Sequence, residues 1–230
     1  MTVIAFIPAR GGSKGVPRKN IKPMAGKPLL QYTVEAAKSC EKIDHVVVNT
    51  EDDEISKIAK KLGALTQDRP EDFWYDNTFQ EVDRLLAWSI SDLERQGFHP
   101  TVVLLLYPTS PLRKPSAIES CLDLVLTENY DSALTLKEDR SYLWKVLKDS
   151  SVQPTNYDPK LRGPNQLEGW NQWVENKAVY VFTRDLIVET GCRLGGKIGF
   201  VEMSKLDSID IDTPDDFKLA EQIILSRDKR

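Results

Sequence analysis

Residues 8–20 combine glycine with positive charge directly after Val3 to Ile7, an apolar run with high β propensity. They read Pro-Ala-Arg-Gly-Gly-Ser-Lys-Gly-Val-Pro-Arg-Lys-Asn, and no acidic residue comes before Glu35, although the chain is net acidic. Glycines let a backbone come close to a ligand with its amides pointing at it. The side chains that can add positive charge are Arg10, Lys14, Arg18 and Lys19. This combination suits a polyphosphate, most simply a nucleoside triphosphate.

The loop matches neither of two common phosphate-binding motifs. The Walker pattern Gly-x-x-x-x-Gly-Lys-Ser/Thr and the dinucleotide pattern Gly-x-Gly-x-x-Gly are both absent. A basic, glycine-rich loop could also be an ordinary solvated turn between a strand and a helix. Arg18 has another cation beside it and is the member most expected to face water.

A second candidate site is acidic, since residues 207–216 read Asp-Ser-Ile-Asp-Ile-Asp-Thr-Pro-Asp-Asp. If residues 209–212 are extended, Asp210 and Asp212 project from the same face, because side chains alternate along a strand. Two carboxylates placed in this way repel each other unless a proton or a cation lies between them. Magnesium is a hard ion that takes oxygen ligands. We therefore expect a Mg²⁺ site here, with Mn²⁺ as an alternative metal.

The two later aspartates of this segment have a simpler interpretation. Pro214 suits the first turn of a helix, and Thr213 can cap that helix. Negative charge in a first helical turn is favourable whatever the function. We expect Asp215 and Asp216 to stabilise the helix start.

Apolar strands alternate with amphipathic helices along the chain. The expected strands are Val3–Ile7, Asp44–Asn49, Thr101–Leu106, Ser132–Leu136 and Ala178–Phe182. The expected helices are Leu29–Ser39, one capped by Asp52 and stopped by Gly63, Thr78–Gln96 and Ser116–Glu128. This alternation predicts an α/β fold with a mainly parallel, twisted sheet and helices on both faces. Ligands bind beyond the carboxyl ends of such strands, so the basic loop and the segment 107–113 should meet there.

The alternation of strands and helices is interrupted between residues 138 and 175. This stretch is polar and rich in Pro, Asn and Gln, yet it contains Trp144, Trp170 and Trp173, which a disordered linker would rarely carry. We expect residues 1–230 to form a single domain whose insertion at about 138–175 packs on something, such as a second subunit. The alternative is that this loop packs on its own domain.

Composition argues against nucleic-acid-binding, histidine-rich metal-binding and membrane-spanning proteins. A net charge of −4 argues against wide nucleic-acid binding. Cys40, Cys121 and Cys192 have no paired spacing and are expected to be buried free thiols, which fits a reducing cytoplasm. His45 and His99 are too few for a histidine-rich metal site. No signal peptide precedes the first strand, and no apolar run approaches the ~18 residues of a membrane span.

Several motifs together resemble those of the acylneuraminate cytidylyltransferases, the CMP-sialic acid synthetases. They are Ile-Pro-Ala-Arg-Gly-Gly-Ser-Lys-Gly-Val-Pro-Arg-Lys-Asn, Asp-Arg-Pro-Glu-Asp followed by an aspartate, Pro-Thr-Ser-Pro-Leu-Arg, the segment 176–182, and Asp-Ser-Ile-Asp-Ile-Asp-Thr. They come in the order of that family and span almost the whole chain. The resemblance implies a Rossmann-like nucleotidyltransferase fold, a homodimer held by the insertion, and a cytoplasmic enzyme.

The resemblance also implies a reaction. The anomeric hydroxyl of a 3-deoxy-2-keto sugar acid attacks the α-phosphate of CTP and pyrophosphate leaves. Implied at the nucleotide are Arg10, Gly11, Gly12, Ser13, Lys14, Lys19, Arg69 and Asp76. Implied at the sugar are Tyr107, Thr109, Ser110, Lys145 and Arg162. Asp210 and Asp212 would hold magnesium, and Lys14, Lys19 and Asp212 would form the catalytic set.

Two residues depart from the family pattern. Tyr107 stands where the family usually has glutamine before Pro-Thr-Ser-Pro, and a phenol offers one hydroxyl in place of an amide. Lys177 stands where the family has the glycine of Asn-Gly-Ala. Tyr107 could simply pack under its loop; otherwise the accepted sugar differs from ordinary sialic acid, with legionaminic or pseudaminic acid as further choices.

Two other functions remain open at this point. One is a sugar nucleotidyltransferase that uses another nucleoside triphosphate, because triphosphate and metal motifs do not read the base. The other is a nucleotide-binding regulator without catalysis. The paired carboxylates argue against the regulator, because a protein that only binds nucleotide needs no second carboxylate.

Overall fold

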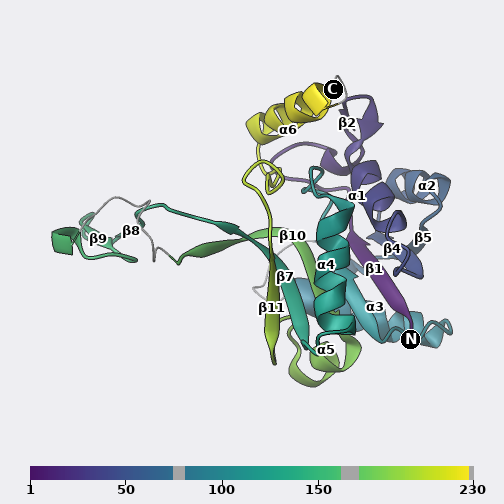
Figure 1. Cartoon of the computed structure of the whole chain (residues 1–230). Helices are drawn as coiled ribbons and strands as arrows, with labels where there is room; N and C mark the ends of the chain where they lie inside the picture. Colours follow the sequence, from purple (N-terminus) through teal and green to yellow (C-terminus); the bar gives the residue numbers. More distant parts are fainter. Residues whose placement is uncertain (75–80, 162–170, 228–230) are drawn as a thin grey trace.

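The computed structural model describes residues 1–74, 81–161 and 171–227, and its centre is a mixed sheet (Figure 1). The strand order in this sheet is β11-β7-β10-β6-β1-β4-β5. Neighbouring strands run parallel, except that β10 is antiparallel to both β6 and β7. The strands of the sheet are β1 (Val3–Pro8), β4 (His45–Thr50), β5 (Leu65–Asp68), β6 (Val102–Leu105), β7 (Ser132–Glu138), β10 (Trp173–Thr183) and β11 (Ile198–Glu202).

Two small hairpins and several helices complete the described chain. The hairpins are β2 (Pro23–Met24) with β3 (Lys27–Pro28), and β8 (Trp144–Val146) with β9 (Val152–Pro154). The α-helices are α1 (Leu29–Lys38), α2 (Asp53–Lys61), α3 (Glu81–Arg95), α4 (Pro115–Leu126), α5 (Arg184–Thr190) and α6 (Pro214–Arg227). Short 3₁₀ helices cover Lys19–Ile21, Glu71–Phe73 and Pro159–Leu161.

Helices cover both faces of the sheet, as the alternation of elements predicts. Buried side chains of α1, α2 and α4 form one cluster with β1, β4 and β6, and those of α3 and α5 form a second with β1, β6 and β10. Alternate residues of β1 illustrate this, since Ala5 belongs to the first cluster and Phe6 to the second. The predicted α/β class with a mainly parallel sheet is confirmed.

The predicted strands and helices are all present, with ends shifted by a few residues, but two sheet strands were missed. β5 reads Leu-Thr-Gln-Asp and is too short and polar to stand out, while β11 contains Gly199 among its five residues. Strand β10 begins at Trp173, so the final residues predicted for the insertion belong to the central sheet. The predicted cap of α2 is confirmed, because the Asp52 side chain accepts hydrogen bonds from the amides of Glu54 and Ile55.

The expected start of the last helix is also confirmed. The Thr213 hydroxyl oxygen accepts a hydrogen bond from the Asp216 amide at 3.2 Å. The Asp216 carboxylate in turn accepts from the Thr213 amide at 2.8 Å, which closes a capping box. Asp216 therefore stabilises the start of α6.

The insertion forms an arm that projects from the body of the molecule (Figure 1). The β8–β9 hairpin lies at its far end, where Trp144 is 49% exposed and packs edge-on against Tyr157 at 5.9 Å between ring centroids. At the base of the arm, Trp173 instead packs on Phe200 of β11 at 5.3 Å. Trp170 lies outside the described residues. One tryptophan thus packs on its own domain, while another is left half-exposed on the arm.

The cysteines match their prediction only in part. Cys40 and Cys121 are buried free thiols, and burial raises the pKa of Cys121 to about 12. Cys192 is exposed, so its predicted burial is wrong; it follows Gly191, which ends α5 at the surface. Over the described residues, no helix combines the length and apolar character needed to cross a membrane.

Candidate active site

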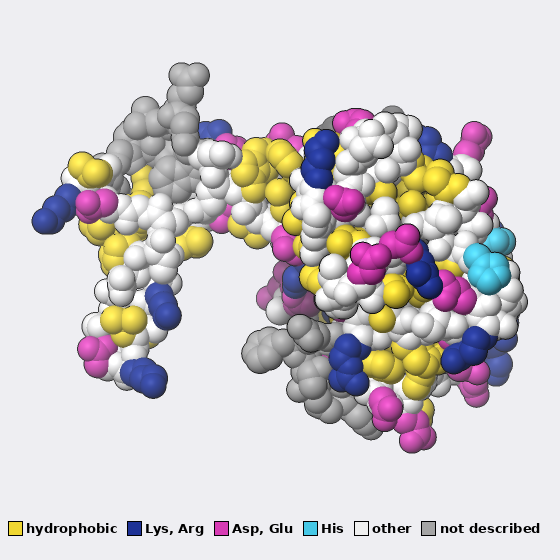
Figure 2. All heavy atoms as spheres, turned by 90° about the horizontal axis from the view of Figure 1, so that it is seen from below, with side chains coloured by type: hydrophobic (Ala, Val, Ile, Leu, Met, Phe, Trp, Pro, Cys, Tyr) yellow, Lys and Arg dark blue, Asp and Glu magenta, His cyan; other side chains and the backbone are white. Residues whose placement is uncertain are grey.

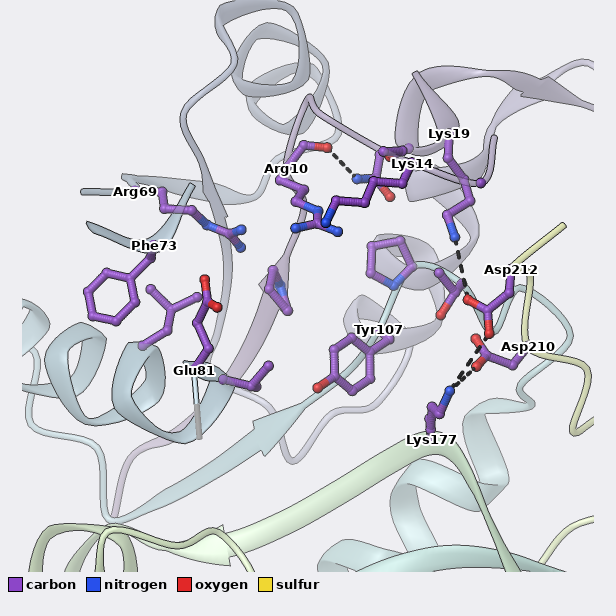
Figure 3. A pocket seen from close by; sticks show the side chains of 18 residues that line it. Arg10, Lys14, Lys19, Arg69, Phe73, Glu81, Tyr107, Lys177, Asp210 and Asp212 are labelled. Atoms are coloured by element: carbon purple, nitrogen blue, oxygen red, sulfur yellow. Dashed lines mark hydrogen bonds and ion pairs between the residues drawn. The ribbon is translucent and has the colours of Figure 1, made fainter. Parts of the chain in front are cut away.

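The basic loop and the aspartate segment face each other across one cavity (Figure 3). It has a volume of about 520 Å³, within the roughly 300–1,000 Å³ of typical small-molecule sites. It lies beyond the carboxyl ends of β1 and β6, as predicted. The predicted residues on its wall are Arg10, Ser13, Lys14, Lys19, Arg69, Tyr107, Thr109, Asp210 and Asp212.

The loop after β1 follows a path that only glycine permits at one point. A Cβ atom on Gly15 would lie 2.0 Å from the carbonyl oxygen of Asp212, far inside contact distance. The buried Asn20 holds the other side of the loop by donating a hydrogen bond to the Arg10 carbonyl at 2.8 Å. Figure 3 shows Arg10, Lys14 and Lys19 converging on the cavity. The loop therefore presents three cations to whatever occupies it.

Not every predicted group of the loop faces the ligand space. The Gly11 amide donates a hydrogen bond to Glu51 Oε1 at 2.7 Å, so it is engaged by a carboxylate rather than directed to a phosphate. Of the loop residues, those on the cavity wall are Arg10, Ser13, Lys14, Gly15, Lys19 and Asn20, a set without Gly11 and Gly12. Arg18 forms ion pairs with Asp52 and Glu54 at the start of α2. Arg18 therefore lies at the surface, as expected for one of two adjacent cations.

Lys19 ties the loop to the aspartate segment. Its ammonium donates a hydrogen bond to the Ile211 carbonyl and lies 3.9 Å from Asp212 Oδ1. Its side chain is only 11% exposed, and this burial lowers the pKa of Lys19 despite the nearby aspartates. A poorly hydrated ammonium of this kind interacts strongly with an added anion such as a phosphate.

Asp210 and Asp212 both line the cavity, as predicted, although residues 209–212 form no strand. Ile211 between them is fully buried, and its amide donates to the Thr109 carbonyl at 2.9 Å. Lys177 of β10 contacts both carboxylates, with its ammonium 2.9 Å from Asp210 Oδ2 and 3.8 Å from Asp212 Oδ2. The hydrogen bond to Asp210 raises the pKa of Lys177.

This pair of carboxylates fits a hard divalent cation. The second oxygen of Asp210, Oδ1, is buried and accepts no hydrogen bond from any described residue. An oxygen in that condition suits a metal ligand. The described residues contain no cluster of three or more His, Cys, Asp or Glu side chains that could enclose an ion. Water and phosphate oxygens could complete the coordination, which is how magnesium is usually held.

The end of the cavity away from the aspartates has an apolar wall beside a buried arginine. Arg69 is 8% exposed and donates through Nε to Asn49 Oδ1 at 2.8 Å, which fixes its guanidinium near the cavity. The apolar wall is formed by side chains that sequence reasoning missed, namely Phe73, Val82 and Leu85, with Glu81 beside them. Val82 and Leu85 lie on the apolar side of α3, and helical periodicity does not distinguish a side chain that lines a cavity from one in the core. Asp76, predicted at the nucleotide, lies outside the described residues.

Tyr107 and Thr109 lie on the wall between these two ends. The Tyr107 ring packs edge-on against Tyr180 at 6.4 Å, and burial raises the pKa of its hydroxyl. Beneath the loop, Arg113 donates to the Ala178 carbonyl at 2.7 Å and to the Tyr107 carbonyl at 3.3 Å, and burial lowers its pKa to about 9. Arg113 thus fixes the loop backbone from behind.

Two described residues predicted at the sugar do not line this cavity, namely Ser110 and Lys145. Ser110 is 1% exposed and is not among the residues that line the cavity, so the structure buries it beneath the loop. Lys145 lies on β8 of the projecting arm, away from the cavity of its own chain, because the insertion leaves the body (Figure 1). Arg162 lies outside the described residues.

Comparison with known proteins gives relatives along almost the whole chain. Residues 4–224 match the family model described as Cytidylyltransferase. N-acylneuraminate cytidylyltransferase A of Danio rerio is 32% identical over 226 residues, which cover 97% of this chain and 51% of that protein. The chain therefore spans about half the length of the first such relatives. CMP-N,N'-diacetyllegionaminic acid synthase of Legionella pneumophila is 29% identical, with 97% of both chains covered.

Solved structures agree on the fold. CMP:2-keto-3-deoxy-manno-octonic acid synthetase in complex with CTP superposes with a TM-score of 0.71 at 16% identity, covering 99% of this chain and 100% of that one. A 4-diphosphocytidyl-2C-methyl-D-erythritol synthase of Anaerococcus prevotii gives 0.68 at 13% identity, with 97% and 98% covered. These identities are low, so the two structures support the architecture alone. Because the family model spans residues 4–224 and thus contains both walls of the cavity, the chain belongs to the cytidylyltransferase family.

Proposed function

We propose that the protein is a magnesium-dependent enzyme that transfers CMP from CTP to the anomeric hydroxyl of a nonulosonic acid and releases pyrophosphate. One observation carries this proposal: Lys19 and Asp212 face the same cavity from distant parts of the sequence and are joined through Ile211. The names of the relatives, which include N-acylneuraminate and diacetyllegionaminic acid enzymes, support the substrate class.

The reaction needs charge neutralisation and alignment more than an activated side chain. A neutral hydroxyl attacks a crowded polyanion, so cations that stabilise negative charge in the transition state lower the barrier. Arg10, Lys14 and Lys19 would hold the triphosphate and then the departing pyrophosphate. Asp210 and Asp212 would hold Mg²⁺, which when bound neutralises phosphate charge and lowers the pKa of a coordinated hydroxyl.

The sugar would lie near Tyr107 and Thr109, between the aspartates and the apolar wall. A phenol at this point changes both the space and the hydrogen bonding available to the sugar. Sialic, legionaminic and pseudaminic acids all remain within the proposed substrate class.

We further propose that the enzyme is a cytoplasmic homodimer. Its arm exposes large apolar side chains, with Val146 at 70% and Leu161 at 82%, and Figure 2 shows hydrophobic side chains along the arm. A partner subunit would cover such residues. The arm would then carry Lys145 towards the partner's cavity. Free cysteines and the use of CTP both fit the cytoplasm.

The direct test measures pyrophosphate release from CTP and Mg²⁺ with a panel of nonulosonic acids. We expect release with at least one sugar, and the CMP-sugar product can be identified by mass spectrometry. Equal activity with ATP, GTP or UTP would overturn the cytidine assignment, and nucleotide binding without turnover on any sugar would favour a regulator.

The metal assignment is tested by Asp212→Asn. The amide is nearly isosteric but carries no charge, so we expect turnover to fall by about 100-fold or more, as for loss of a key electrostatic group, with an unchanged melting temperature. Asp215→Asn is the matched control, because this carboxylate lies on the exposed surface of α6. Near-normal turnover of Asp212→Asn in Mg²⁺ would show that the carboxylate is dispensable.

A further inference from the structure

Lys177 occupies an unusual backbone position. It has φ of +58°, in the left-handed region that lysine rarely adopts. It lies where the pairing of β10 with β7 shifts register, between Glu175 and Tyr180. Bulges of this kind redirect a side chain, and here the Lys177 side chain leaves the sheet and enters the cavity (Figure 3).

Buried polar contacts hold the bulge in this shape. Asn176 accepts hydrogen bonds from the Thr135 hydroxyl at 2.6 Å and from the Ala178 amide at 3.1 Å. It also donates to the hydroxyl of Ser208 at 2.9 Å, two residues before Asp210. The backbone that aims Lys177 is therefore linked directly to the segment that carries the aspartates.

The ammonium of Lys177 lies at the carboxylate pair, 2.9 Å from Asp210 and 3.8 Å from Asp212. A cation shared by these two carboxylates would occupy the same region, because it would need oxygens from both. Two positive charges at one carboxylate pair repel each other, so the ammonium and a divalent ion compete for the pair.

We propose that Lys177 is a tethered competitor of the metal: it neutralises the aspartate pair in the metal-free enzyme and must leave when a divalent cation binds. This inference rests on the proposed metal site and deepens it. The residue at this position would then set how much free metal the enzyme requires, independently of the groups that bind the nucleotide.

The test is direct metal binding to the nucleotide-free protein, measured from the electron paramagnetic resonance signal of free Mn²⁺ at fixed ionic strength. Lys177→Gly removes the ammonium and relaxes the backbone, while Lys177→Asn removes the ammonium and keeps a residue that tolerates positive φ. We expect both variants to bind Mn²⁺ about two- to fivefold more tightly, since loss of a partly exposed ion pair has an effect of this order. Lys177→Arg keeps the charge and should stay near the unmodified protein.

Lys42→Asn is the matched control, because it removes a cation and an exposed ion pair with Asp123 on α4, outside the cavity. Unchanged affinity in Lys177→Asn, or tightening in the glycine variant alone, would overturn the proposal, because the effect would then not come from the charge. Asp212→Asn distinguishes a failure of the proposed metal site from a failure of the Lys177 proposal. If it binds Mn²⁺ as well as the unmodified protein, the metal site itself is misassigned; if it loses binding while the Lys177 variants are unaffected, only the competitor proposal fails.

Discussion

Three lysines at the cavity show how surroundings decide the role of one side-chain type. Lys19 is buried, its pKa is lowered by that burial, and its ammonium is fixed on the Ile211 carbonyl. Lys177 is half-exposed, and the carboxylate of Asp210 raises its pKa. Lys14 reaches into the cavity from the glycine-rich loop (Figure 3). These contacts give Lys19 a structural role in addition to its proposed contact with the phosphates, whereas the proposed role of Lys14 is mainly at the ligand.

This difference gives a prediction for Lys14→Ala. Loss of a charge-assisted hydrogen bond of about 1.5–3 kcal/mol should raise the KM for CTP by roughly tenfold or more, with a much smaller effect on the KM for the sugar. Steady-state kinetics with each substrate varied in turn would separate these effects. Lys27→Ala is a suitable control, since Lys27 pairs with Glu35 on the surface. A change confined to the sugar KM would contradict the assignment of the loop.

At the scale of elements, the site depends on contact between two segments almost 200 residues apart. Val16 of the loop and Ile211 of the aspartate segment belong to the same buried cluster, which α6 covers with Phe217. The close approach at Gly15 and the hydrogen bond of Ile211 to Thr109 join the segments on the cavity side. The loop, the aspartates and the start of the segment after β6 therefore behave as one unit.

Gly15→Ala tests this unit. The added methyl group would meet the Asp212 carbonyl, so we expect a loss of about 1–3 kcal/mol in stability from overpacking, together with weaker Mn²⁺ binding. Denaturant unfolding and metal titration would measure the two effects. Gly12→Ala is the matched control in the same loop, because a Cβ atom there has no described heavy atom within 4 Å. Equal tolerance of both substitutions would show that the segments can move apart.

Much of this arrangement could be predicted from the sequence, and the remainder could not for identifiable reasons. The strands around the site are apolar runs, and both the basic loop and the Asp210–Asp212 pair follow from residue types and alternation. The register shift at Lys177 has no such signal, because it depends on pairing between β10 and β7 and on the buried Asn176 network. The burial of Ser110 has no such signal either: the resemblance implied a place at the sugar, whereas the turn after β6 buries this side chain.

At the scale of the whole molecule, the arm is the part least accounted for by a single chain. It carries aromatic and aliphatic side chains on a two-stranded hairpin, which alone has little capacity to bury them. The body, in contrast, has a closed core on both faces of the sheet. This contrast supports the proposal that the arm packs on a second subunit.

Subunit complementation would test that arrangement. If Lys145 serves the partner's cavity, a Lys14→Ala chain and a Lys145→Ala chain should together form mixed dimers in which one cavity has both lysines. Co-expression of the two variants should then give more activity than either variant alone, and light scattering should show a dimer. Additive activities without recovery, or a monomer in solution, would contradict the shared site.

Arg113 holds the loop after β6 without contacting the side chain at position 107. It anchors the loop after β6 through the carbonyl oxygens of Tyr107 and Ala178, and every residue type carries that oxygen. The hydrogen bond from Arg113 therefore does not depend on which side chain is present at position 107, although that side chain faces the cavity. A substitution at position 107 can therefore reshape the wall of the cavity while the loop backbone stays in place, so the wall and its support can change independently.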